Sequence, residues 1–294
     1  MGLRGNPTYR QRRYGAEVRA IRERAGFTAA LAAEVMGMNA SHISTVESGR
    51  TGLSADRLRR LAAAVGSEDS TYVEALIDLG QRTGKGWWSE YRHVLGAPHL
   101  DLAELEDMAC VLRTYEPLFV PGLLQTRPYV EAIHRGGYRS ASQAEQEAQV
   151  EFRVQRQRVL TGERAPRLHA IIHEAALSAS LGDRNVMRGQ LLHLIEMSRL
   201  PHITIQILPF DGPVGFGTGF VMIEPQVAEL GTVIVSHIEQ SLYLDGADTA
   251  AKYSDWFAKL ANVALPPIDA ATAPEARTAK DSLGLIQRLL YPLL

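Results

Sequence analysis

Short side chains that can contact the edges of DNA bases occur together between residues 39 and 50. With one small apolar residue and one arginine among them, they are Asn39, Ala40, Ser41, His42, Ser44, Thr45, Ser48 and Arg50. If residues 40–48 form a helix, most of these polar groups lie opposite the apolar Ile43 and Val46. A major groove about 12 Å wide admits one such helix, with short polar side chains near its N-terminal end. We therefore expect this stretch to contact bases, with His42 and Ser48 at the flanks and Arg50 next to a phosphate.

Short helices joined by tight turns are expected to position this stretch. Apolar residues at helical spacing predict helices over residues 15–25, 28–37, 40–48, 54–66 and 71–82. Glycines stand near the ends of the first four, at positions 26, 37, 49 and 66. Thr28 can cap the second helix, whose exposed N-terminus can also contact a phosphate. Residues 14–83 are therefore expected to form an all-α domain of four to five helices that is large enough to fold alone.

The residues of this segment resemble the phage-repressor-like (XRE) helix-turn-helix family. The match is carried by Thr28, Leu31, Ala32, Met36-Gly37, Ile43-Ser44, Glu47 and Gly49-Arg50. The resemblance implies a DNA-recognition helix over residues 40–48 and a structural role for Glu47. Thr28 departs from the family, in which glutamine is frequent at this position, so the resemblance implies a phosphate contact rather than a base contact there. An unrelated helical bundle with the same apolar pattern is the alternative interpretation.

The charge of the chain is unevenly distributed, although the formal net charge is only −2. Residues 1–66 contain eleven arginines and five acidic residues, so this part carries +6 and the remainder carries −8. A basic end suits a polyanion binder, because neutralised phosphates supply the nonspecific part of the affinity. An arginine-rich solvated surface is the alternative. Residues 1–13 are expected to form a basic arm, whose Arg10, Arg12 and Arg13 either follow a groove of the DNA or are disordered.

The expected recognition helix lacks arginine, glutamine and lysine, which read guanine or adenine through paired hydrogen bonds. Specificity would then come partly from hydroxyl groups, from methyl contacts such as that of Ala40, and from DNA shape. One domain of this kind reads only a short half-site. We therefore expect a homodimer on a pseudo-palindromic operator in double-stranded DNA.

After residue 86 the sequence predicts a mixed α/β domain with a small sheet, over residues 87–265. Helices are expected over residues 87–115, 128–135, 141–161, 184–198 and 248–261, and strands over 168–173, 203–208, 219–223, 232–237 and 241–244. Residues 266–279 have the composition of a linker, and residues 280–294 predict an apolar C-terminal helix. Cys110 is the one cysteine of the sequence, and its place among apolar residues predicts a buried thiol.

Residues 87–265 resemble the DUF5753 domain of actinobacterial regulators. The resemblance rests on Trp87-Trp88, Tyr115-Glu116, Val120–Tyr129, Arg156-Gln157, Glu174–Leu177, Gln190-Leu191 and Ile207–Phe210. It implies a transcriptional regulator of the antitoxin-like, WhiJ-like type, often encoded beside a small partner protein of the DUF397 type. One interpretation is a homodimeric transcription factor whose second domain receives a signal. The other is an antitoxin-like protein that sequesters the small partner and autoregulates its operon.

The segment with the most specific match is a candidate surface for a partner protein or a ligand. It consists of Pro121, Gly122, Leu123, Leu124, Gln125 and Thr126. Proline fixes φ and Gly122 allows a tight turn, so the segment can form a rigid and partly apolar loop. The alternative is an element that packs inside the domain and seats its helices. Dimerisation, a partner protein and a small-molecule ligand all stay open for the domain as a whole.

Enzymatic chemistry is not expected, and no catalytic residue, metal or cofactor is assigned. His169, His173 and Glu174 are close in sequence, but the metalloprotease order H-E-x-x-H is absent and a strand is expected there. The glycine-rich residues 212–219 lead into a strand, so we expect a turn or a ligand lid rather than a phosphate-binding loop. Residues 1–14 do not resemble a signal peptide, and no apolar run reaches the ~18 residues of a membrane span. These patterns predict a cytoplasmic protein that associates with the nucleoid.

Overall fold

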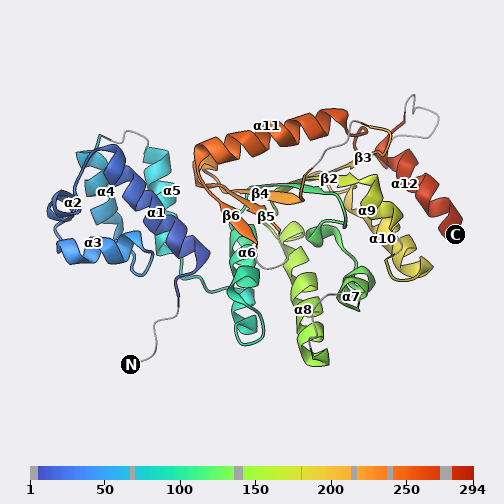
Figure 1. The fold of residues 1–294 in the computed structure, drawn as a ribbon, viewed down its shortest axis with the longest axis horizontal. Coiled ribbons are helices and arrows are strands. Elements are labelled where there is room, and N and C mark those ends of the chain that lie inside the picture. The colour runs from blue at the N-terminus through green and yellow to red at the C-terminus, as the bar shows by residue number, and fades with distance from the viewer. Residues whose placement is uncertain are drawn as a thin grey trace. The chain divides into compact units, whose positions relative to one another are not determined.

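The computed structural model describes residues 6–66, 70–135, 142–179, 181–212, 217–236, 241–271 and 280–294. The chain forms two compact units (Figure 1). The first comprises Met1–Arg92, Gly96–Leu105 and Gln226–Leu230, and the second comprises His93–Leu95, Glu106–Pro225 and Gly231–Leu294. The first unit is therefore assembled from three separate stretches of the chain.

Five α-helices among the described residues form the body of the first unit. They are α1 (Tyr9–Arg24), α2 (Ala29–Met36), α3 (Ala40–Glu47), α4 (Ala55–Ala64) and α5 (Ser70–Gln81). The hydroxyl oxygens of Thr8, Thr28 and Ser54 accept backbone N–H groups and so define the starts of α1, α2 and α4. The apolar faces of the helices meet in a core that includes Val18, Ala32, Ile43, Leu58 and Leu76. The prediction of an all-α N-terminal domain is confirmed.

Further segments complete the first unit. They are η1 (Trp87–Tyr91), most of α6 (Ala97–Asp107) and the chain around η4 (Ala228–Leu230). Val227 and Leu230 are 8% and 7% exposed and belong to the same apolar core as α1–α5. The observed division thus differs from the expected boundaries of 14–83 and 87–265, because side chains far along the sequence fill the core of the helical unit.

Six strands within the described part of the second unit form one mixed sheet. They are β1 (Val111–Glu116), β2 (Arg167–His173), β3 (Ile203–Leu208), β4 (Phe220–Glu224), β5 (Thr232–Val235) and β6 (Leu242–Leu244), in the order β3-β2-β1-β4-β5-β6. β1, β2 and β3 run parallel, whereas β4, β5 and β6 continue the sheet as antiparallel neighbours. The carboxyl ends of β1, β2 and β3 therefore share one edge of the sheet. The prediction of a mixed α/β domain with a small sheet is confirmed.

Helices lie on both sides of this sheet (Figure 1). α11 (Ala247–Val263) runs along one face, where Phe257 and Leu260 share a core with Tyr115 and Phe220. α7 (Arg127–Arg135) and α8 (Gln143–Arg156) lie on the other side, with η2 (Gly122–Leu124) before α7 and η3 (Gln157–Leu160) after α8. α9 (Glu174–Ser178) and α10 (Arg184–Met197) connect β2 to β3.

One stretch that was expected to be helical is a strand. The apolar spacing of residues 87–115 predicts a helix throughout, but Val111–Glu116 forms β1, which lies between β2 and β4. Both faces of β1 are covered, so its polar and apolar residues do not alternate cleanly and the pattern does not separate a strand from a helix. Cys110 lies just before this strand and is exposed, so the prediction of a buried thiol is wrong.

The expected linker begins as an ordered part of the sheet edge. The N–H groups of Leu265 and Ile268 donate to the carbonyls of Ile207 and Ile205, both at 2.9 Å. Ile268 is 6% exposed, which shows that this stretch packs on β3. Residues 272–279 of the expected linker lie outside the described part of the chain.

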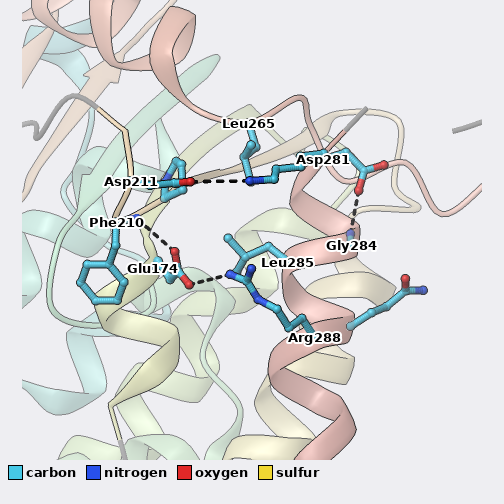
Figure 2. A pocket seen from close by; sticks show the side chains of 11 residues that line it. Glu174, Phe210, Asp211, Leu265, Asp281, Gly284, Leu285 and Arg288 are labelled. Carbon is cyan, nitrogen blue, oxygen red and sulfur yellow. Dashed lines mark hydrogen bonds and ion pairs between the residues drawn. The ribbon is translucent and has the colours of Figure 1, made fainter. Parts of the chain in front are cut away.

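The expected C-terminal helix is α12 (Ser282–Leu290), followed by η6 (Tyr291–Leu293). Its apolar face is buried through Leu283, Leu285 and Ile286. Arg288 on another face pairs with Glu174, the residue that follows β2 (Figure 2). No helix in the parts that the structure describes combines the length and the apolar character needed to cross a bilayer.

Candidate nucleic-acid interface

α2 and α3 form a helix-turn-helix, and the turn between them requires a glycine. Gly37 ends α2 with φ 61° and ψ 49°, in the left-handed region that favours glycine. Ala32 of α2 is fully buried, and Ile43 and Val46 of α3 are each 1% exposed. Because these side chains face the core, the opposite face of α3 points away from it.

A close backbone approach holds α3 against α1. A Cβ atom on Gly15 would lie 2.5 Å from the carbonyl oxygen of Val46, and one on Gly49 would lie 2.5 Å from the carbonyl oxygen of Gln11. Neither position has room for a side chain, so glycine is required where the two helices cross. From the sequence, Gly49 is only a helix stop, and Gly15 carries no signal that singles it out.

The exposed face of α3 consists of residues that the sequence predicts for base contact. Asn39, Ala40, Ser41, His42, Ser44 and Ser48 are exposed, as is Arg50 just beyond the helix. Asn39 is the N-cap residue by its backbone geometry, but its side chain makes no capping hydrogen bond. Its amide group therefore remains able to contact a base edge. DNA contact by this set stays a prediction.

Thr45 and Ser48 use their hydroxyl protons within the protein. The Thr45 hydroxyl donates to the His42 carbonyl at 2.7 Å and is hydrogen-bonded to the Thr51 hydroxyl at 3.1 Å. The Ser48 hydroxyl donates to the Thr45 carbonyl at 3.1 Å. A hydroxyl has one proton and two lone pairs, so we expect both oxygens to accept hydrogen bonds from DNA amino groups rather than donate to bases.

A bidentate ion pair connects the C-terminal end of α3 to α1. Arg22 Nε and Nη2 donate to the two carboxylate oxygens of Glu47 at 2.5 and 3.1 Å, and Arg22 Nη1 donates to the Phe27 carbonyl at 2.8 Å. Both charged side chains are 13% exposed. The hydrogen bond to Glu47 raises the pKa of Arg22 above its ordinary value, so the guanidinium stays charged. Glu47 thus has the structural role that the family resemblance implies.

Thr28 lies at the exposed N-terminus of α2. Its hydroxyl oxygen accepts the Leu31 N–H at 3.2 Å, which confirms its capping role. The hydroxyl proton is still able to donate, and the first N–H groups of a helix have no acceptor within the helix. This end of α2 therefore suits a phosphate oxygen. The phosphate contact itself stays a prediction.

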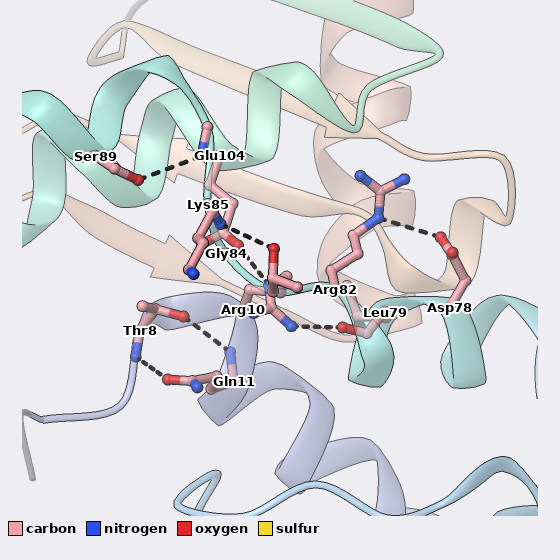
Figure 3. A network of polar contacts seen from close by, with 12 residues as sticks. Thr8, Arg10, Gln11, Asp78, Leu79, Arg82, Gly84, Lys85, Ser89 and Glu104 are labelled. Carbon is pink, nitrogen blue, oxygen red and sulfur yellow. Dashed lines mark hydrogen bonds and ion pairs between the residues drawn. The ribbon is translucent and has the colours of Figure 1, made fainter.

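The prediction of a basic N-terminal arm over residues 1–13 is wrong from Tyr9 onward, where the chain enters α1. Arg10 is only 3% exposed. Its guanidinium donates to Glu104 at 2.5 Å and to the Leu79 carbonyl at 2.6 Å (Figure 3). Thr8 forms a capping box with Gln11 beside this network, which fixes the start of the helix. Residues 1–5 lie outside the described part of the chain.

Arg13 is also internal to the first unit. It is 5% exposed, pairs with Glu17 at 2.6 Å and donates to the Glu229 carbonyl at 3.0 Å. Arg12 differs, because its side chain is 52% exposed and lies 3.9 Å from Asp101. Part of the positive charge counted in the sequence is therefore neutralised inside the unit and is not offered to DNA.

The segment Pro121–Thr126 lies inside the second unit, so its prediction as a partner or ligand surface is wrong. Leu123, Leu124 and Gln125 are 6%, 0% and 2% exposed. The side-chain amides of three glutamines satisfy the backbone of this segment. Gln125 donates to the Val120 carbonyl, and Gln157 donates to the carbonyls of Gly122 and Gln125. Gln190 donates to the Leu124 carbonyl and accepts the Thr126 N–H. An irregular backbone that cannot reach water needs such partners. The alternative interpretation, a packing element that seats the helices, describes this segment.

Buried charges surround this segment. Arg156 pairs with Glu106 at 2.7 Å, with side-chain exposures of 12% and 3%. Arg153 donates to Gln125 Oε1 at 3.2 Å, and burial lowers the pKa of Arg153 to about 10. Burial also raises the pKa of Glu116, at the end of β1, to about 7, although the Arg153 charge acts in the opposite direction. The second unit therefore contains a carboxyl group that titrates near neutral pH.

His169 and His173 are engaged within the second unit. His169 Nε2 is hydrogen-bonded to Gln206 Oε1 at 2.7 Å, and His173 Nδ1 accepts the Ala175 N–H at 3.0 Å to cap α9. Burial lowers the pKa of both histidines. Among the residues that the structure describes, no group of three His, Cys, Asp or Glu side chains is placed to hold a metal ion. Of the expected glycine-rich turn, residues 213–216 lie outside the described part.

Comparison with known families gives two matches. The family model described as a helix-turn-helix domain (HTH_31) matches residues 13–75, and the model described as a domain of unknown function (DUF5753) matches residues 100–273. No curated protein and no solved structure matches the chain. The first match contains the α2–α3 pair, and the second contains every strand of the sheet.

Proposed function

This chain belongs to the DUF5753 family and carries a helix-turn-helix domain, and from this premise we propose that it is a sequence-specific transcriptional regulator that binds its operator as a homodimer. The helix-turn-helix domain supports a DNA-binding regulator. The observation that carries the proposal is the exposed polar face of α3. Its opposite face is held by the buried Ile43 and Val46 and by the Arg22–Glu47 pair.

The N-terminal half of α3 offers small donors and acceptors at fixed positions. The exposed hydroxyl groups of Ser41 and Ser44 and the amide of Asn39 can each donate or accept, and Ala40 leaves room for a thymine methyl group. Single contacts of this kind discriminate less than paired ones, so DNA shape contributes to the specificity. Because the helix is already held in place, little conformational freedom is lost on binding.

The short length of the expected recognition helix favours a dimer. One α3 of eight residues reads a short half-site, and a two-fold symmetric pair reads two half-sites about 34 Å apart. We favour this role over an antitoxin-like one that sequesters a small DUF397-type partner. The reason is that the segment Pro121–Thr126, the candidate surface for a partner protein or a ligand, is largely buried.

Selection of binding sites from random DNA duplexes by the full chain tests this proposal. We expect the enriched sequences to contain two inverted half-sites and to bind about 1,000-fold more tightly than a scrambled duplex of equal length. Light scattering of the complex should give two chains per duplex. Absence of any enriched sequence would contradict the regulator, and one chain per duplex would contradict the dimer.

Bulky substitutions on α3 test the assigned face. Ser41→Leu combined with Ser44→Leu should abolish the preference for the enriched duplex while binding to scrambled DNA persists, because phosphate contacts are retained. Ala64→Leu adds similar bulk at an exposed position of α4 and serves as the matched control. Circular dichroism establishes that all three chains are folded. If the α3 variant keeps its full preference, α3 is not the recognition helix.

A further inference from the structure

A pocket of about 620 Å³ opens in the second unit where β2 and β3 end. Glu174 follows the last residue of β2, and Phe210 and Asp211 follow β3. α12 supplies Leu285 and Arg288 from the other side (Figure 2). Open α/β sheets usually bind ligands at the carboxyl ends of their parallel strands, and a volume of about 300–1,000 Å³ suits a small molecule.

A buried carboxylate fixes one cation of this pocket. Glu174 Oε1 accepts from Arg288 Nη2 at 2.9 Å, and Glu174 Oε2 accepts the Phe210 N–H at 3.0 Å. The Glu174 side chain is 11% exposed, whereas the Arg288 side chain is 65% exposed. Glu174 thus orients the guanidinium and the turn after β3. Arg288 has five N–H donors, so further donors can meet the carboxylate of a ligand.

A second, looser ion pair also lines the pocket, and it includes Asp211, which lies near Glu174 (Figure 2). Lys280 Nζ and Asp211 Oδ2 are 3.6 Å apart, and their side chains are 83% and 75% exposed. Such an exposed pair contributes little stability, so a ligand can replace either partner at small cost. Asp211 can then accept hydrogen bonds from an ammonium group.

Apolar side chains line the space between the ion pairs. Phe210, Leu265 and Leu285 supply the apolar part of the lining, and Glu174 lies between Phe210 and Leu285 in Figure 2. The Phe210 ring is held edge-on against His173, with centroids 5.2 Å apart, yet Phe210 is 57% exposed. A fixed aromatic ring beside a pocket offers an apolar contact to a ligand.

We propose that this pocket binds a small zwitterion with an apolar body, which is the chemistry of a free apolar amino acid. Its carboxylate contacts Arg288, its ammonium group contacts Asp211, and its side chain contacts Phe210 and Leu285. A zwitterion can contact both Arg288 and Asp211, whereas a simple acid or a simple amine can contact only one of them, so the zwitterion is favoured. A role of this ligand as an effector of DNA binding rests on the proposed function, whereas its binding does not.

Calorimetric titration of the full chain without DNA tests this site. The probes are L-phenylalanine, 3-phenylpropionate and phenethylamine, which share the ring and differ in their charged groups. We expect phenylalanine to bind one site per chain and the other two to bind at least tenfold more weakly, because each lacks one charge-assisted contact. Absence of saturable phenylalanine binding, or equal affinity for either of the other probes, would overturn the proposal.

Two substitutions separate the ionic contacts. Arg288→Gln should weaken phenylalanine and phenylpropionate binding at least tenfold. Asp211→Asn should weaken phenylalanine binding but leave phenylpropionate binding unchanged, which a general folding defect would not do. Arg199→Gln is the matched control, because Arg199 is a 62% exposed arginine of the same unit in a surface ion pair. Equal phenylalanine affinity of Arg288→Gln and Arg199→Gln would overturn the assignment, and a failure here leaves the DNA-binding proposal standing.

Discussion

We expect the Arg22–Glu47 pair to contribute measurably to the stability of the contact between α3 and α1. Glu47→Gln keeps the shape of the side chain but removes the charge that accepts two hydrogen bonds, at 2.5 and 3.1 Å. Hydrogen bonds to charged groups contribute roughly 1.5–3 kcal/mol each, and removing one partner of a fully buried pair costs roughly 3–5 kcal/mol. Because both side chains are 13% exposed, we expect a loss of about 2 kcal/mol in the stability of the first unit.

Hydrogen exchange of the full chain measures this loss locally. A loss of about 2 kcal/mol lowers the protection of α3 amides about 30-fold, whereas amides of β2 and β3 should keep their protection. Glu74→Gln is the matched control. Glu74 accepts two hydrogen bonds from Arg59 of α4, and both side chains are 53% exposed, so removing this pair should leave the protection of α3 unchanged.

A double-mutant cycle shows whether the loss comes from the pair itself. When Arg22→Gln and Glu47→Gln are combined, the total loss should be smaller than the sum of the single losses by about 1–2 kcal/mol. Arg22→Gln alone should cost more than Glu47→Gln, since Arg22 also donates to the Phe27 carbonyl. Strictly additive losses, or the same protection of α3 in Glu47→Gln and Glu74→Gln, would refute the reasoning.

Further expectations concern DNA affinity, packing and pH. Arg50→Ala should weaken binding to operator and random duplexes alike and lower the salt slope by about 1, measured by fluorescence anisotropy; a loss confined to the operator would assign Arg50 to a base instead. Gly15→Ala should destabilise the first unit by about 2 kcal/mol, because the new Cβ would lie 2.5 Å from the Val46 oxygen; unchanged hydrogen exchange in α1 and α3 would contradict this. The pKa of Glu116 rises from 4.5 to about 7 on folding. Between these two pH values the folded chain keeps a proton that the unfolded chain releases, so the stability of the folded chain should fall as the pH rises from 4.5 to about 7. Thermal unfolding of Glu116→Gln should depend less on pH than that of the parent, and an equal dependence would argue against a buried protonated Glu116.

The helix-turn-helix was predictable because its signals are local. Thr28 caps α2 through the N–H of Leu31, three residues away, and Gly37 ends the same helix in a left-handed conformation. Residues so close in sequence reveal their relation by spacing alone. The exposed and buried faces of α3 followed from the same helical period, with Ile43 and Val46 inward.

The features that the sequence did not reveal depend on partners far along the chain. Arg10 donates a hydrogen bond to Glu104, and Gln190 donates one to the Leu124 carbonyl. The sequence separation of these partners follows neither a helical nor a strand period. A charged residue near a terminus is normally exposed, so burial of Arg10 becomes visible only when its partner is placed. The sequence does not predict β1 for a related reason, since the strand character of this segment comes from the neighbouring β2 and β4.

The discontinuous make-up of the first unit affects the order in which the protein can be completed. Val227 and Leu230 fill part of the core formed by α1–α5, and the Glu229 carbonyl accepts a hydrogen bond from the buried Arg13. A nascent chain that has not yet reached these residues lacks that apolar contact and that acceptor, although every residue of α1–α5 has been made. The DNA-binding unit is therefore finished only after residue 230 has left the ribosome. A continuous block of sequence that ends before residue 227 would lack these two side chains and this acceptor.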